Sequence, residues 1–126
     1  MNITLWVLQI LLALAFFAHG WLLLAPPPEI AVQMKASLPR AFWVFLGWAE
    51  ILAAVGLTLP AATRILPGLV PAAAVGITIV MISATVYHLV RAEYFSSLIT
   101  MVLLAMATFV AYARWRLAPI RPRSAA

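Results

Sequence analysis

Four long apolar runs divide the chain, and they restrict its fold more than any other feature. They cover residues 3–24, 41–59, 65–90 and 94–113, so each run holds 19 to 26 residues. A helix of about 20 apolar residues crosses the ~30 Å hydrocarbon core of a bilayer. Because backbone groups in lipid must bond within their own segment, such runs are helices. The short connections favour neighbours in up-down order, so we predict an all-α, integral membrane four-helix bundle.

The composition indicates lipid as the main solvent. Hydrophobic residues make up 67% of the chain and charged residues 9%, with a mean hydropathy of +1.11. This leaves too few charges to cover a soluble domain. There is no cysteine, which excludes disulfides, thiolate-bound zinc, cysteine-ligated clusters and cysteine nucleophiles. The net charge is +5, but the basic residues form no patch with interleaved aromatics, so we expect no nucleic-acid binding.

The segments between the runs complete the predicted organisation. The first run lacks a basic leader and is too long for a signal peptide, so we interpret it as a retained helix. Residues 29–40 mix apolar and charged side chains, which favours a short amphipathic segment at the membrane interface. We expect one transmembrane domain over residues 1–118 and a flexible cytoplasmic tail over residues 119–126.

Basic residues between the runs predict the orientation. Five arginines lie on the side of both termini, namely Arg64, Arg114, Arg116, Arg121 and Arg123. Three basic residues lie on the opposite side, namely Lys35, Arg40 and Arg91. Because cytoplasmic loops carry the excess of Lys and Arg, we expect both termini in the cytoplasm and the bundle in the bacterial inner membrane.

Glu50 stands in the second apolar run, where an ionised carboxyl is hardest to accommodate. It lies about 13 Å along the helix from Ala41, close to the bilayer midplane. A charge there costs at least ~2.5–3.5 kcal/mol. Glu50 therefore either stays protonated or ionises beside a cationic partner in a cavity that water reaches. Ionisable residues inside membranes are functional by default, although a structural carboxyl that bonds a neighbouring helix is the plainer alternative.

Two histidines are the candidate partners, and with Glu50 they form the candidate catalytic set of Glu50, His19 and His88. His19 and Glu50 differ in depth by about 6 Å, so an imidazole can reach the carboxyl if the two helices are neighbours. His88 lies nearer the membrane surface, beside Arg91 and Glu93, where a structural role is equally open. The depths of Glu50 and His88 differ by about 11 Å, which disfavours a shared metal site, and we predict none.

An apolar pocket with a few polar groups would suit a small molecule. The candidate ligand-binding residues that would line it are Phe16, Trp43, Gly47, Met81 and Thr85. Trp43, Gly47 and Glu50 share one helical stripe. The simpler interpretation is that the Met and Thr stripes pack helices together and that the tryptophan anchors the helix at the membrane interface. The chain lacks aspartate, a G-x-S-x-G elbow and a phosphate-binding loop, which excludes the corresponding enzyme classes.

Several stretches together resemble the DoxX-like family of small bacterial four-helix membrane proteins. They are FFAHGW, MKASLPRAF, GWAEILAAVGLTLP, HLVRAE and AYARW. The resemblance runs from about Leu5 to Trp115, with Gly47 and Glu50 at the family's G-x-x-E position. Many relatives carry lysine near the end of the first helix, where this chain has histidine and glycine. The family is named for a subunit of a quinone-linked thiosulfate oxidoreductase.

Two functions follow as hypotheses. In the first, the protein binds a small lipophile such as a quinone beside Glu50 and serves as a subunit of a redox complex. Its partners would then be the lipid bilayer, redox subunits or further copies of itself. In the alternative, Glu50 and His19 act as acid and base on a lipophilic substrate, in an isomerisation or ring-opening.

Overall fold

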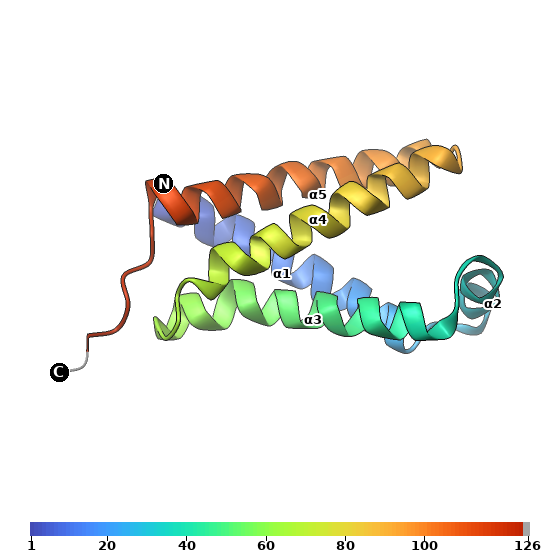
Figure 1. The fold of residues 1–126 in the computed structure, drawn as a ribbon, viewed down its shortest axis with the longest axis horizontal. Coiled ribbons are helices and arrows are strands. Elements are labelled where there is room, and N and C mark those ends of the chain that lie inside the picture. The colour runs from blue at the N-terminus through green and yellow to red at the C-terminus, as the bar shows by residue number, and fades with distance from the viewer. Residues whose placement is uncertain (125–126) are drawn as a thin grey trace.

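Four long helices and one short helix build the protein, and a computed structural model describes residues 1–124 (Figure 1). The long helices are α1 (Asn2–Leu24), α3 (Arg40–Thr63), α4 (Leu69–Val90) and α5 (Tyr94–Tyr112); the short one is α2 (Pro28–Ser37). Each long helix is long and apolar enough to cross a membrane. The prediction of an all-α membrane bundle with a short segment between the first two spans is confirmed.

The long helices follow one another around the bundle. α1 packs on α3, α3 on α4 and α4 on α5, and α5 returns to α1. Both termini and the α3–α4 connection lie at one end in Figure 1, and the α4–α5 turn and α2 lie at the other. Consecutive spans are therefore antiparallel, in up-down order.

The α2 helix runs across the far end of the bundle (Figure 1). Proline in its first turn starts the helix without losing a hydrogen bond. Arg40 holds this end together, because its Nη1 and Nη2 donate to the carbonyls of Leu23 and Leu24, each at 2.6 Å. These bonds satisfy two of the carbonyls left open where α1 ends. Trp43 Nε1 donates to the Met34 carbonyl at 3.1 Å, which ties α2 to the start of α3.

The ends of two spans differ from the boundaries that the sequence predicts. α3 continues past Pro60 and ends at Thr63, followed by Arg64 in the left-handed conformation with φ 59°. Proline removes only one donor, and one turn from the helix end this does not stop the helix. α4 begins at Leu69 instead of residue 65, because the preceding residues form the connection.

Beyond α5 the chain makes one π-helical turn, η1 (Ala113–Leu117). The Ala118 N–H donates to the Ala113 carbonyl at 2.7 Å across five residues. The predicted flexible tail, residues 119–126, has no helix over residues 119–124. There, the Arg123 N–H donates to the Arg64 carbonyl at 2.9 Å. Residues 125 and 126 lie outside the described residues.

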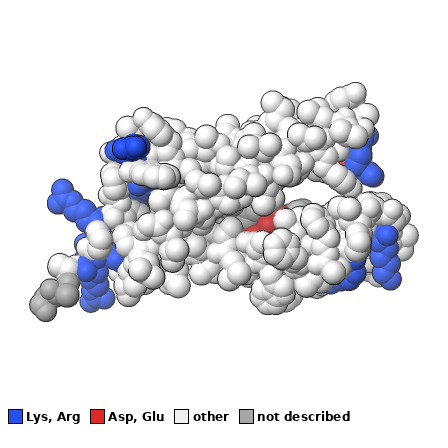
Figure 2. Space-filling model, in the orientation of Figure 1, with Lys and Arg blue, Asp and Glu red and all other residues white. Residues whose placement is uncertain are grey.

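The core is mainly apolar, and the basic side chains visible in Figure 2 gather at the two ends of the bundle. Leu5, Leu12, Leu57 and Ile77 are among its fully buried members. The middle of each span presents apolar side chains outward, as a lipid-facing surface requires.

Candidate functional site

The site begins with a close helix crossing between α1 and α3. A β-carbon built on Gly20 would lie 2.7 Å from the Gly47 carbonyl oxygen, and one built on Gly47 would lie 2.9 Å from the Gly20 carbonyl oxygen. Such separations are too short for any side chain, so the two backbones touch here. Gly47, a candidate ligand-binding residue, thus faces α1. The contact places the neighbouring positions 19 and 50 side by side.

His19 and Glu50 form a hydrogen-bonded pair between the two helices. His19 Nδ1 lies 2.6 Å from Glu50 Oε2, and the shared proton can reside on either atom. The Glu50 side chain is 3% exposed, whereas the His19 side chain is 53% exposed. Among the described residues, His19 Nε2 has no hydrogen-bond partner. The pair therefore joins a buried carboxyl to a half-exposed imidazole.

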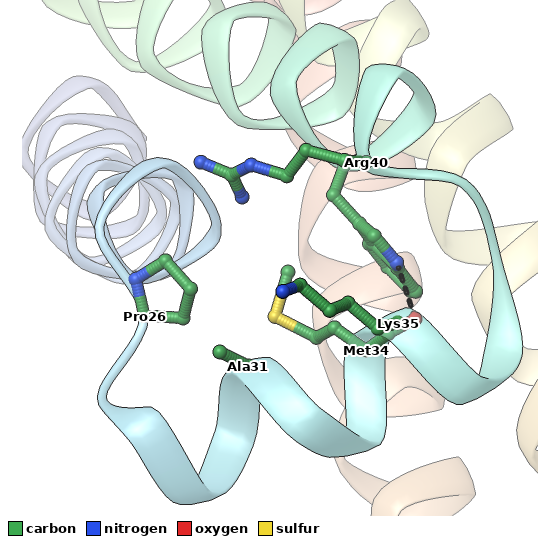
Figure 3. Close-up of a pocket in the computed structure, with 6 residues that line it drawn as sticks. Pro26, Ala31, Met34, Lys35 and Arg40 are labelled. Atoms are coloured by element: carbon green, nitrogen blue, oxygen red, sulfur yellow. Dashed lines mark hydrogen bonds between the residues drawn. The ribbon is translucent and has the colours of Figure 1, made fainter.

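The bundle is hollowed on one face. Figure 2 shows a hollow between the part of the bundle formed by α4 and α5 and the part formed by α2 and α3, with an acidic side chain at its inner margin. A separate cavity of about 240 Å³ lies at the far end, beneath α2 (Figure 3). Trp43 lines that cavity, and neither His19 nor Glu50 does.

The other predicted pocket residues pack inside the bundle. Phe16 is 2% exposed and Met81 5% exposed, and both belong to the apolar core. The hydroxyl oxygens of Thr85 and Thr100 lie 2.9 Å apart, which links α4 to α5. Thr85 also donates to the Met81 carbonyl at 2.7 Å. These contacts are those of helix packing, and no hydrogen bond described here joins them to Glu50.

His88 belongs to a second cluster, at the turn between α4 and α5. His88 Nδ1 lies 2.6 Å from Glu93 Oε2, and Arg91 Nε donates to Glu93 Oε1 at 2.8 Å. The Arg91 guanidinium also stacks over the Tyr87 ring, 5.2 Å from its centre. The bond from Arg91, and then that from His88, holds the pKa of Glu93 below its usual value. The structure thus gives each histidine its own glutamate.

The comparison with protein families decides the assignment. A model of the DoxX-like family matches residues 7–110, well over half of the chain. The chain belongs to the DoxX-like family. Neither the search of curated proteins nor that of solved structures found a significant match. The DoxX-like region includes both histidine–glutamate pairs and ends before Arg114, and the predicted resemblance is confirmed.

This DoxX-like protein also contains a buried polar network that the sequence analysis missed. Arg114 Nε donates to Gln9 Oε1 at 2.6 Å, and Gln9 Nε2 donates to the Leu57 carbonyl at 2.6 Å. Arg114 Nη1 donates to Asn2 Oδ1 at 2.7 Å. The network links α1, α3 and η1 at the end that holds both termini. The signal was Gln9, an amide in an otherwise apolar run, because polar groups at such positions bond across helices.

Within residues 1–124 of the DoxX-like chain, no group of three or more His, Asp or Glu side chains is placed to hold a metal ion. The candidate site is therefore the pair of His19 and Glu50, in the membrane-spanning part of the bundle.

Proposed function

We propose that this DoxX-like protein binds a small lipophile with a carbonyl or hydroxyl oxygen, such as a quinone, at the His19 ring. The observation that carries the proposal is the 2.6 Å contact between a buried carboxyl and a half-exposed imidazole. A carboxylate bonded to one ring nitrogen fixes the orientation of the ring and determines the role of the other nitrogen. The free Nε2 is then directed at whatever occupies the space beside His19.

Two protonation states of the pair, which differ by one proton, give Nε2 two hydrogen-bonding roles. When Nδ1 carries the proton and donates to Glu50, the Nε2 of a neutral ring is an acceptor and suits a quinol hydroxyl. When the Glu50 carboxyl donates to Nδ1, Nε2 carries the proton and suits a quinone carbonyl. The same pair can thus bind both redox forms of one ligand. It can also exchange a proton with them inside the membrane.

The position of the pair supports a lipophilic ligand. Both residues lie in helices that are apolar over their length, and Figure 2 shows a hollow toward the α2 end of the bundle, with an acidic side chain at its inner margin. Small-molecule sites are commonly apolar with a few oriented polar groups. The chain has no cysteine, so cysteine-held iron–sulfur clusters are excluded. In the accessory role that we propose, electrons pass between the quinone and a partner subunit.

Titration with a short-chain benzoquinone and its quinol tests the proposal. The purified protein in detergent is titrated while its tryptophan fluorescence is followed. We expect the Kd to rise about tenfold or more in His19→Phe, because a hydrogen bond to the ligand is lost. Glu50→Gln should widen the difference between the Kd values for quinone and quinol, since an amide cannot gain and lose the proton that switches Nε2 between its two roles.

His88→Phe is the matched control, because it removes a histidine that bonds a glutamate at the same 2.6 Å distance but at the bundle end. Its Kd should equal that of the wild type. Equal Kd values for the wild type, His19→Phe and His88→Phe would refute quinone binding at His19.

Acid–base catalysis on a lipophilic substrate is the alternative function, and the shared proton favours it. A carboxyl and an imidazole in hydrogen-bond contact can donate and accept protons in one active site. Turnover of a lipophilic ketone or lactone would support this alternative if it is lost in both Glu50→Gln and His19→Phe. Unchanged turnover in both variants would exclude these residues from such a reaction.

We also propose that both termini face the cytoplasm of a bacterial inner membrane. The end that holds the termini carries five arginines, and the opposite end carries three basic residues, which supports this orientation. Reporter fusions test it: an enzyme active only in the cytoplasm should work when fused after Ala126. The same reporter should be inactive when inserted into the α4–α5 turn, and the reverse pattern would contradict the proposal.

A further inference from the structure

A second cavity opens at the end of the bundle that holds both termini. Its volume is about 560 Å³, and it lies between the start of α4 and the η1 segment. Its walls include Pro67, Gly68, Ala72, Val75, Arg114 and Ile120. It is distant in the fold from the α2 end and does not include His19 or Glu50. It is therefore a site separate from the one already described.

Arg114 is the charged group of this cavity, and its hydrogen bonds are incomplete. Its side chain is 3% exposed. A guanidinium has five N–H donors. Nε donates to Gln9, and Nη1 donates to Asn2 and to the Ala118 carbonyl, the latter at 3.2 Å. Nη2 is buried and has no hydrogen-bond partner in the described part of the chain. Buried donors of this kind are rare and point to a missing acceptor.

The missing acceptor is an anion, on grounds of charge. The partners of Arg114 are amide and carbonyl oxygens, all neutral. The only acids of the chain are Glu29 on α2, Glu50 in the middle of α3 and Glu93 at the α4–α5 turn. None of the three lies at this end of the bundle. A buried cation without a counter-charge is costly, and an anionic ligand in the cavity would remove that cost.

The remaining walls indicate the kind of anion. The N-terminus of α4 borders the cavity through Pro67 and Gly68. The N–H groups of Leu69, Val70 and Ala72 already donate to carbonyls, so this helix end offers an anion only the partial positive charge of its dipole. Val75 and Ile120 supply apolar surface beside it. We propose that this cavity binds a phosphate-bearing anion at Arg114, and that the apolar walls favour the headgroup of an anionic phospholipid over a free phosphate ion.

Two glycines of the α4 region provide a matched pair of variants. A β-carbon on either Gly68 or Gly76 would meet no atom within 4 Å, so both positions accept a larger side chain. Gly68 lines the cavity, whereas Gly76 does not. Gly68→Leu should place an apolar side chain in part of the cavity beside Arg114, and Gly76→Leu controls for the added apolar side chain. Arg114→Gln tests the charge, but it also disturbs the Gln9 network.

Native mass spectrometry of the delipidated protein measures the binding directly. Wild-type protein in detergent is mixed with phosphatidylglycerol or with phosphatidylcholine, and the bound fraction is titrated. We expect phosphatidylglycerol to bind about tenfold or more tightly than phosphatidylcholine. The headgroup of phosphatidylglycerol is anionic and can make a charge-assisted hydrogen bond to Arg114, whereas the choline of phosphatidylcholine offsets the phosphate charge. Gly68→Leu should lose that preference, and Gly76→Leu should keep it.

The outcomes separate the two sources of phosphate. If millimolar inorganic phosphate displaces phosphatidylglycerol, the site recognises the phosphate group of the lipid. If inorganic phosphate raises the Tm of the wild type but not of Gly68→Leu, with no lipid preference, a free phosphate ion is the ligand. If phosphate has no effect and the two lipids bind equally to all variants, the proposal is wrong.

Discussion

Gly20 and Gly47 bring α1 and α3 into backbone contact, because a β-carbon on Gly20 would lie only 2.7 Å from the Gly47 carbonyl oxygen. His19 and Glu50 lie next to this crossing, one residue and three residues away along their helices. Their 2.6 Å hydrogen bond therefore depends on how closely the helices approach. The glycines set the geometry of the pair without touching a ligand.

Gly47→Ala should destabilise the bundle and separate His19 from Glu50. Overpacking of a tight contact costs about 1–3 kcal/mol, and the neighbouring atom here is a backbone oxygen that cannot rotate away. Reversible unfolding in mixed micelles measures the change. Gly76→Ala is the control, because its added methyl group meets open space. Equal stability of the two variants would show that the crossing has room to spare.

Gln9→Leu should destabilise the protein by removing the shared partner of two groups. Arg114 Nε then loses its acceptor, at about 1–3 kcal/mol for an orphaned buried donor, and the Leu57 carbonyl loses the bond that it accepts from α1. The double variant Gln9→Leu/Arg114→Met should be less destabilised than the sum of the single variants, because no buried guanidinium remains. Thermal unfolding of all three variants tests this. Strict additivity would mean that the residues act independently.

The hydroxyl pair of Thr85 and Thr100 should contribute modestly to the packing of α4 on α5. Interhelical hydrogen bonds in membranes contribute about 0.6 kcal/mol on average, with a maximum of about 1.7. A double-mutant cycle with Thr85→Val and Thr100→Val should give a coupling energy in that range. Thr108→Val is the control, since its hydroxyl bonds within its own helix. A coupling energy of zero would contradict the contact.

Glu93→Gln should alter the acid side of the pH–stability curve. The pKa of Glu93 is lowered from 4.5, chiefly by Arg91 and then by His88. A carboxyl whose pKa is lower in the folded state stabilises the fold above its unfolded pKa and loses that contribution as the pH falls through the folded pKa. The wild type should therefore exceed Glu93→Gln in Tm at pH 6, and the difference should shrink below pH 4.5. Glu29→Gln is the control, and a pH-independent difference would contradict the prediction.

The four membrane-spanning helices and the contact between His19 and Glu50 could be predicted from the sequence. Apolar runs predicted four helices, and helical rise placed His19 close enough to Glu50 to meet it. Helix ends were harder, because Pro60 ends a helix only where enough hydrogen bonds are lost, and one turn from the end they are not. Arg64 in the left-handed conformation marks the actual end, and arginine is not a residue that signals it.

The sequence marks Gln9 as a buried polar group, but it does not predict the partner of Gln9. Gln9 and Arg114 stand 105 positions apart, and only closure of the bundle brings them together. An arginine at the end of an apolar run normally extends to the lipid surface, so its turn inward through η1 had no signal in the sequence. Met81 and Thr85 were predicted to line a pocket but pack inside the bundle. The sequence could not distinguish the two, because a helical stripe of such residues is compatible with a pocket and with a packed core.

The His19 ring is half-exposed in the membrane-spanning part of the bundle, and this position determines the route by which a ligand would reach it. It stands on a helix that is long and apolar enough to cross the bilayer, so a ligand of the proposed kind would reach it by diffusing sideways within the membrane. Occupancy would then follow the number of ligand molecules per lipid, and the concentration in the surrounding water would matter only through partitioning. Diluting the membrane with inert lipid should therefore lower the fraction of protein with ligand bound at His19, even when the total amount of ligand is unchanged.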